Sequence, residues 1–126
     1  MQLLERSWKR SWLALNAQSA NGLFEALVSC YQEPHRKYHT LQHLSECIER
    51  LEANLEQAEQ PGEVEVALWF HDAIYDLKKK DNEHRSAQWA ERELAASGVP
   101  ADVVARVYRL VMATQHTALP STQGER

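Results

Sequence analysis

Histidine and aspartate side chains that could bind a metal occur at two places in the chain. His71 and Asp72 stand side by side in the otherwise apolar segment ALWFHDAIYD. A buried carboxylate is costly unless it is paired or bound to a cation, so Asp72 needs a partner. Upstream, the segment YHTLQHL carries His39 and His43 four positions apart. Imidazole nitrogens together with a carboxylate oxygen suit zinc, manganese, iron or nickel rather than calcium.

Helical geometry would allow these side chains to act together. On a helix, His39 and His43 would lie about 40° apart on one face, although His39 precedes the expected cap Thr40. His71 and Asp72 would lie about 100° apart, so one metal ion between them could contact both. Three protein ligands and a fourth position open to water are typical of a catalytic metal site. Such a metal lowers the pKa of bound water towards ~7 and supplies hydroxide at neutral pH. The alternative for His71 and Asp72 is a buried, hydrogen-bonded pair without metal.

Apolar residues recur at spacings of three and four along the chain and predict helices almost throughout. The expected helices cover residues 2–16, about 21–32, 40–59, 64–75, 81–97 and 100–114. Thr40 is the expected N-cap of the third helix, and Ser19 or Asn21 that of the second. The fourth helix is apolar nearly all round, which is typical of a central helix. No strand pattern occurs, so we predict an all-α fold, a compact bundle of about six helices.

Length, charge and leader signals limit the classes of function. A chain of 126 residues fits one domain, which we assign to residues 1–116, followed by a polar tail at 117–126. The net charge of −4 argues against nucleic acid as an obligate partner. The N-terminus is too charged for a signal peptide, and no apolar run approaches the ~18 residues of a membrane span. We therefore expect a cytoplasmic protein without a membrane partner.

The two cysteines, Cys30 and Cys47, lie in apolar-periodic segments and form no CxxC motif. We interpret them as small buried hydrophobic residues. A disulfide or a reactive thiol is the alternative.

Four segments in a fixed order, YHTLQHL, ALWFHDAIYD, DNEHRSA and ATQHT, resemble the HD-domain superfamily of metal-dependent phosphohydrolases. More narrowly, they resemble a bacterial branch of predicted HD phosphohydrolases, over most of the chain. The resemblance implies an HD-type helical bundle with His43, His71 and Asp72 as ligands of a divalent ion (Mn, Mg, Fe, Co, Ni or Zn). It further implies His39 and Asp72 as catalytic residues. By analogy with cyclic-nucleotide phosphodiesterases, His39 would protonate the leaving oxygen.

One element of the HD pattern is absent from this sequence. HD proteins take a fourth metal ligand from an aspartate on a later helix. The last aspartate here is Asp102, at the predicted start of a helix, and His116 is the only later residue of a strong ligand type. We therefore expect that the chain lacks the C-terminal part of an HD domain or has a degenerate site.

Further polar residues could contact a substrate or support the metal ligands. Basic residues in the loops before His39 and after the HD pair, including Lys78–Lys80, could form a positive rim that attracts phosphate. The alternative is an ordinary solvated charge run. An acidic side chain at a helix start also has a helix-dipole explanation. The candidates for these roles are Arg36, Lys37, Asp76, Glu83, His84 and His116.

The His43, His71 and Asp72 pattern predicts a metal that activates water, and the resemblance to HD proteins implies a phosphohydrolase in which that water attacks a phosphate ester. The expected partner is a phosphate-bearing small molecule such as a nucleotide. One alternative is a non-catalytic helical module that binds a nucleotide or a protein and keeps a degenerate HD site. Another is a helical fragment that forms a homodimer through an apolar face left uncovered.

Overall fold

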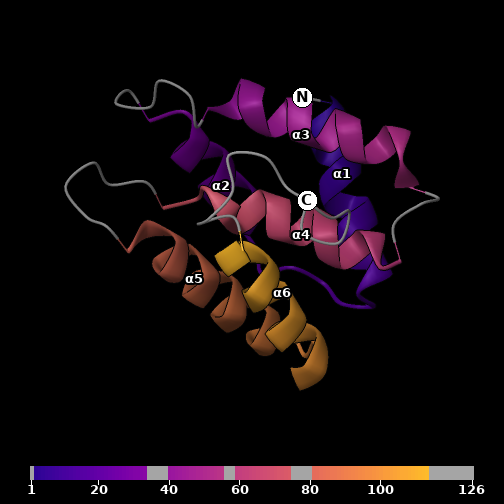
Figure 1. Cartoon of the computed structure of the whole chain (residues 1–126), viewed down its shortest axis with the longest axis vertical. Coiled ribbons are helices and arrows are strands. Elements are labelled where there is room, and N and C mark those ends of the chain that lie inside the picture. The colour runs from indigo at the N-terminus through magenta and orange to yellow at the C-terminus, as the bar shows by residue number, and fades with distance from the viewer. Residues whose placement is uncertain (1, 34–39, 56–58, 75–80, 114–126) are drawn as a thin grey trace.

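Six helices and no strand make up the part of the chain that the structure describes. The computed structural model describes residues 2–33, 40–55, 59–74 and 81–113. Figure 1 shows the helices as one compact bundle, which confirms the predicted all-α fold class. Within the described residues, every helix is too short or too polar to cross a bilayer. The helices are α1 (Gln2–Ala14), α2 (Leu23–Tyr31), α3 (Leu41–Ala53), α4 (Pro61–His71), α5 (Asn82–Ala96) and α6 (Ala101–Ala113).

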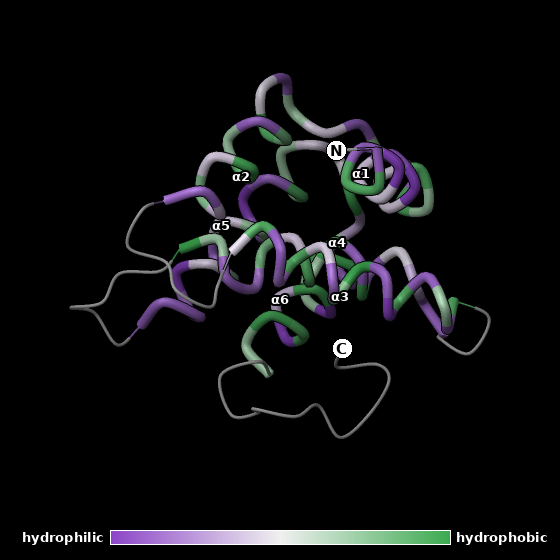
Figure 2. Tube along the Cα trace, turned by 90° about the horizontal axis from the view of Figure 1, so that it is seen from above, coloured by the Kyte–Doolittle hydropathy of each residue, from purple (hydrophilic) through white to green (hydrophobic). Residues whose placement is uncertain are grey.

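Helix α4 is the centre of the bundle, as its apolar sequence predicts. Its residues from Gly62 to His71 are all buried. Figure 1 shows α3 along one side of α4 and α5 and α6 along the other. Figure 2, turned by 90°, places α1 and α2 on one side of α4 and α6 on the opposite side. Because α4 contacts α1, α3, α5 and α6, it can bring residues from several helices to one place.

Aromatic side chains form much of the core between α1, α2 and α4. The ring of Trp8 packs against Trp12, Phe24 and Trp69, with centroid distances of 5.5, 5.9 and 5.0 Å. Tilted and edge-on contacts of this kind are the favoured geometries of aromatic pairs. Trp69 is completely buried, and Trp89 of α5 is partly buried. All four tryptophans therefore lie in the core or pack against it.

The N-cap of α3 agrees with the sequence-based prediction, whereas the N-cap of α2, the end of α3 at Ala53 and both ends of α4 differ from it. Thr40 caps α3, because its Oγ1 accepts a hydrogen bond from the His43 N–H at 3.3 Å. The predicted caps of α2 are wrong, since Gly22 is the N-cap, with a φ of 86° that suits glycine. The fourth helix begins earlier than predicted, because Pro61 occupies its first turn, where proline is well tolerated. It also ends earlier, at His71.

A network of arginine and glutamate side chains joins α1, α3 and α4. On α4, Glu65 is 1% exposed and accepts hydrogen bonds from Ser7 Oγ at 2.6 Å and from Arg10 Nε at 3.0 Å. Arg10 also donates to Glu52 of α3 at 2.7 Å, and Arg6 donates to the same carboxylate at 2.9 and 3.0 Å. We call these five residues the arginine–glutamate network. This network was not predicted from the sequence.

Charge pairing within this network shifts the pKa values of its members. Hydrogen bonds from Arg6 and then from Arg10 lower the pKa of Glu52 to about 2. The hydrogen bond to Glu65 raises the pKa of Arg10 above its ordinary value. The Glu52 carboxylate and the guanidinium groups of Arg6 and Arg10 are therefore favoured in their charged forms.

Candidate metal centre

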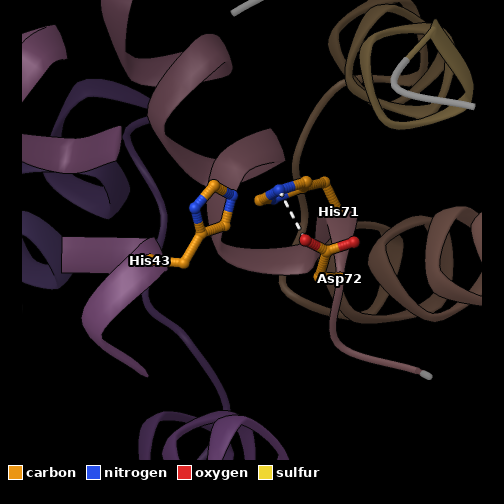
Figure 3. Close-up of side chains that lie close together, drawn as sticks. All are labelled: His43, His71 and Asp72. Carbon is orange, nitrogen blue, oxygen red and sulfur yellow. Dashed lines mark ion pairs between the residues drawn. The ribbon is translucent and has the colours of Figure 1, made fainter. Parts of the chain in front are cut away.

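Three side chains that could bind a metal converge at the C-terminal end of α4. His43 comes from α3, His71 is the last residue of α4, and Asp72 follows it directly. One ligand atom from each of the three lies within 4.8 Å of the others. Figure 3 shows the imidazole of His43 facing His71 and Asp72 from the neighbouring helix. The structure thus brings together the three residues predicted as metal ligands.

The position of His43 follows from the start of α3. The Thr40 cap fixes the first turn of the helix, and His43 is the third residue of that turn. The next apolar residues on the same helix, Leu44 and Ile48, are completely buried and anchor α3 in the core. The ring of His43 is then 6.2 Å from that of His71, measured between centroids.

The orientation of His71 is fixed by a backbone carbonyl. Its Nδ1 lies 2.5 Å from the carbonyl oxygen of Leu68. A carbonyl oxygen can only accept, so Nδ1 carries the proton that it donates there. In the neutral imidazole, Nε2 then presents its lone pair. A carbonyl partner of this kind is common for metal-binding histidines, because it sets the tautomer and the orientation of the ring.

Asp72 reaches His71 because the helix ends between them. The prediction of a helix through residue 75 placed both residues on one helical surface, and this is wrong. Asp72 has φ and ψ of −116° and 18° at the C-cap of α4. Its Oδ2 lies 3.0 Å from His71 Nε2 (Figure 3). Two groups that both offer lone pairs repel at this distance unless a proton or a cation lies between them.

The two imidazoles and one carboxylate form a donor set that suits a divalent transition metal. Nitrogen and oxygen ligands in this number occur in catalytic zinc sites, and imidazole also suits iron, nickel and copper. His71 is buried and His43 and Asp72 are half-buried, so the cluster lies at the edge of the core. The residues present therefore fit a divalent ion.

A cysteine that the sequence analysis assigned to the core contacts one of these histidines. Cys47 Sγ lies 3.7 Å from His43 Nε2, one turn further along α3. The four-residue spacing between His43 and Cys47 is the sequence signal that could have indicated this contact. Cys30 and Cys47 form no disulfide, and both are half-buried rather than buried as predicted.

The other predicted site residues do not join the cluster within the described residues. His84, at the start of α5, is exposed, and its Nδ1 lies 2.8 Å from the hydroxyl of Tyr108 on α6. Glu83 is half-buried in the first turn of α5 and lies outside the three-residue group. Asp102 has a side chain that is 71% exposed and pairs with Arg106, so it is not a fourth ligand here.

Several predicted residues fall outside the described part of the chain. These are Arg36, Lys37, His39, Asp76, Lys78–Lys80 and His116. Their roles stay predictions.

Comparisons of the chain with protein-family models, with curated proteins and with solved structures found no match. The interpretation of the cluster therefore rests on its residues and their geometry.

Proposed function

We propose that this protein is a metal-dependent hydrolase of the HD type that holds a divalent ion between His43, His71 and Asp72. One observation carries the proposal: His71 Nε2 and Asp72 Oδ2 lie 3.0 Å apart while His71 Nδ1 is already bonded to Leu68. When His71 is neutral, both atoms offer lone pairs towards the same place, and His43 approaches from the other side. A cation at this point would be within reach of all three groups.

The three ligands and His39 would have different roles in the reaction. The two imidazoles would supply neutral ligands, and the carboxylate of Asp72 would supply the negative charge. A divalent ion held by them would supply activated water at neutral pH and polarisation of a substrate oxygen. Asp72 is half-buried, so its carboxylate can also meet solvent and orient water. His39, as the predicted general acid, would deliver the proton to the leaving oxygen.

The choice of a phosphate ester as substrate is supported by the resemblance of the four sequence segments to HD phosphohydrolases. A nucleotide is the candidate substrate of this class. The basic residues expected around the site, including Arg36 and Lys37, would favour a substrate with negative charge.

Metal content provides the first test. The purified chain, loaded with Mn²⁺, Co²⁺, Ni²⁺ or Zn²⁺ and freed of excess ion, should retain close to one equivalent by elemental mass spectrometry. The His71→Ala variant should lose it. His84→Ala is the matched control, because His84 is exposed and outside the cluster, and it should retain the ion. If the unaltered chain retains no ion, the metal centre is wrong.

Activity provides the second test, on chain shown to hold metal. Hydrolysis of nucleoside phosphates and of a phosphodiester such as bis(4-nitrophenyl) phosphate should require the ion and should be lost in Asp72→Ala. If the metal-loaded chain hydrolyses none of these esters, the assignment to phosphohydrolases is wrong even though the metal centre stands.

A non-catalytic binding module is the second candidate, and the exposed position of Asp102 favours it. In HD proteins an aspartate on a later helix completes the ligand set. Asp102 is the aspartate on the described part of α6, and it does not belong to the His43–His71–Asp72 group. Nucleotide binding, measured by calorimetry, that survives both His71→Ala and Asp72→Ala would support this alternative. Loss of binding in both variants would contradict it.

A further inference from the structure

The backbone between Asp72 and Ile74 leaves helix α4 and must find new hydrogen-bond partners. A helix end exposes backbone groups that the helix itself cannot satisfy. The described contacts give each of the three N–H groups a partner. Asp72 N–H donates to the hydroxyl of Tyr31, Ala73 N–H to the carbonyl of Phe70, and Ile74 N–H to the hydroxyl of Ser86.

The hydroxyl group of Tyr31 contacts the backbone both before and after the end of α4. The side chain lies at the end of α2 and is 1% exposed. Its hydroxyl donates to the carbonyl of Trp69 at 2.9 Å and accepts from Asp72 N–H at 3.2 Å. The same oxygen lies 3.4 Å from the carbonyl of Leu68, the group that orients His71. Tyr31 therefore contacts the backbone that fixes both His71 and Asp72.

Ser86 holds the other end of the turn. The residue is completely buried on α5, and its Oγ accepts from Ile74 N–H at 3.0 Å. Between these two hydroxyl contacts lies Ala73, which is 1% exposed. Side chains from α2 and α5 thus hold the turn after α4 by hydrogen bonds, and this turn carries the proposed ligand Asp72.

We infer that the hydroxyl groups of Tyr31 and Ser86 are positioning groups for the metal centre, because they set where the carboxylate of Asp72 lies relative to His71. This inference rests on the proposed metal centre. A metal ligand must lie within a few tenths of an ångström of its place, so a loosened turn weakens binding without removing a ligand. Neither hydroxyl would touch the ion.

Tyr31→Phe and Ser86→Ala remove one hydroxyl each and keep the rest of the side chain's packing. With Co²⁺ as the probe, we expect a dissociation constant 10- to 100-fold higher than that of the unaltered chain, with stoichiometry still near one. The visible absorption spectrum of bound Co²⁺ should also change, since it reports the geometry of the ligands. The unchanged stoichiometry separates a positioning role from loss of a ligand.

Ser11→Ala is the matched control for loss of a buried hydroxyl. Ser11 is completely buried on α1, and its Oγ donates to the carbonyl of Trp8 at 2.9 Å. This variant should lose stability but keep the Co²⁺ affinity and spectrum of the unaltered chain. Circular dichroism would establish that each variant is folded, and Ser86→Ala still tests the inference if Tyr31→Phe does not fold.

The outcomes separate this inference from the function on which it rests. If the unaltered chain binds no Co²⁺, the metal centre fails and the inference with it. If the unaltered chain binds Co²⁺ and the folded Tyr31→Phe or Ser86→Ala variant binds it with the same affinity and spectrum, only the inference is overturned. The hydroxyls would then have a purely structural role.

Discussion

Two carboxylates near opposite ends of helix α4, those of Glu65 and Asp72, have different kinds of partner. Near its start, Glu65 meets Arg10 and Ser7 in the arginine–glutamate network. At its end, Asp72 meets His71 and lies beside His43. Glu65 lies within the apolar helix and Asp72 lies at its C-cap, and the partner described for the first carboxylate is a guanidinium group whereas that described for the second is an imidazole.

The difference separates a structural site from a binding site. In the network, two arginines balance two glutamates, and each pair is joined by direct hydrogen bonds. Such a cluster is complete without a ligand. In the His43–His71–Asp72 cluster, all three groups can offer lone pairs to one point, which is what a metal ion requires. The network should therefore control stability, and the cluster should control metal binding.

The largest expected effect is on the network. Arg10→Ala would leave the carboxylate of Glu65 buried without its guanidinium partner. Removing one member of a buried ion pair lowers the free energy of unfolding by about 3–5 kcal/mol. Urea unfolding followed by circular dichroism would measure it.

Arg106→Ala is the control for this substitution. Arg106 also pairs with a glutamate of α4, Glu63, but its side chain is 36% exposed. We expect a smaller loss than in Arg10→Ala, because the side chain of Glu63 is 10% exposed and that of Glu65 only 1%, so solvent screens the pair with Arg106 more strongly. Equal losses in the two variants would contradict the special role of the buried network.

These two clusters also show which features of the fold could be predicted from the sequence. The spacing of apolar residues predicted the helices, and the costly burial of Asp72 correctly indicated a partner. Glu65 has the same apolar surroundings in the sequence and also has partners, Arg10 and Ser7 of α1. A sequence does not say whether the partner is a cation from a distant helix or a bound ion, since α1 and α4 meet only in the folded chain.

The next effect concerns the metal cluster. A divalent ion that binds only the folded state raises the free energy of unfolding by about 2.7 kcal/mol at a concentration 100 times its dissociation constant. We expect this rise for the unaltered chain and none for Asp72→Asn, which keeps the shape of the side chain but removes its charge. Thermal unfolding with and without Zn²⁺ or Mn²⁺ would measure it.

Asp102→Asn makes the same change at an exposed position on α6 and should preserve the stabilisation by metal. If Asp72→Asn is stabilised as much as the unaltered chain, Asp72 is not a ligand. If Arg10→Ala keeps the metal-induced rise while losing stability, the division of roles between the two clusters is supported.

Acid should weaken the network through Glu52. The folded state lowers the pKa of this carboxyl from 4.5 to about 2, so the folded protein favours its charged form. Its contribution to stability is complete above pH 4.5 and is lost as the pH falls towards 2. We expect roughly 1–2 kcal/mol from this residue, after allowance for solvent screening.

Unfolding by urea at several pH values between 2 and 6 would test this dependence. Glu52→Gln should show a shallower fall in stability over the same range. An unchanged slope in Glu52→Gln would mean that other carboxyl groups account for the acid sensitivity.

The site itself was only partly predictable, for reasons of local geometry. The ligand types of His43, His71 and Asp72 could be recognised from the sequence. The early end of α4 could not, because it depends on hydroxyl groups from α2 and α5 that replace its backbone hydrogen bonds. Tyr31 in particular looks like an ordinary core residue on an apolar stripe.

The smallest expected effect is that of replacing Cys47, which lies beside the metal cluster, on the affinity for Zn²⁺. Cys47 Sγ contacts His43 Nε2 at 3.7 Å but does not belong to the group whose ligand atoms all lie within 4.8 Å of one another. Cys47→Ser should therefore change the affinity for Zn²⁺ less than tenfold, which is under about 1.4 kcal/mol. Competition with a chromophoric chelator would measure it. A loss of a hundredfold or more, with Mn²⁺ affinity unchanged, would show that the thiolate is a ligand, because thiolate favours zinc over manganese.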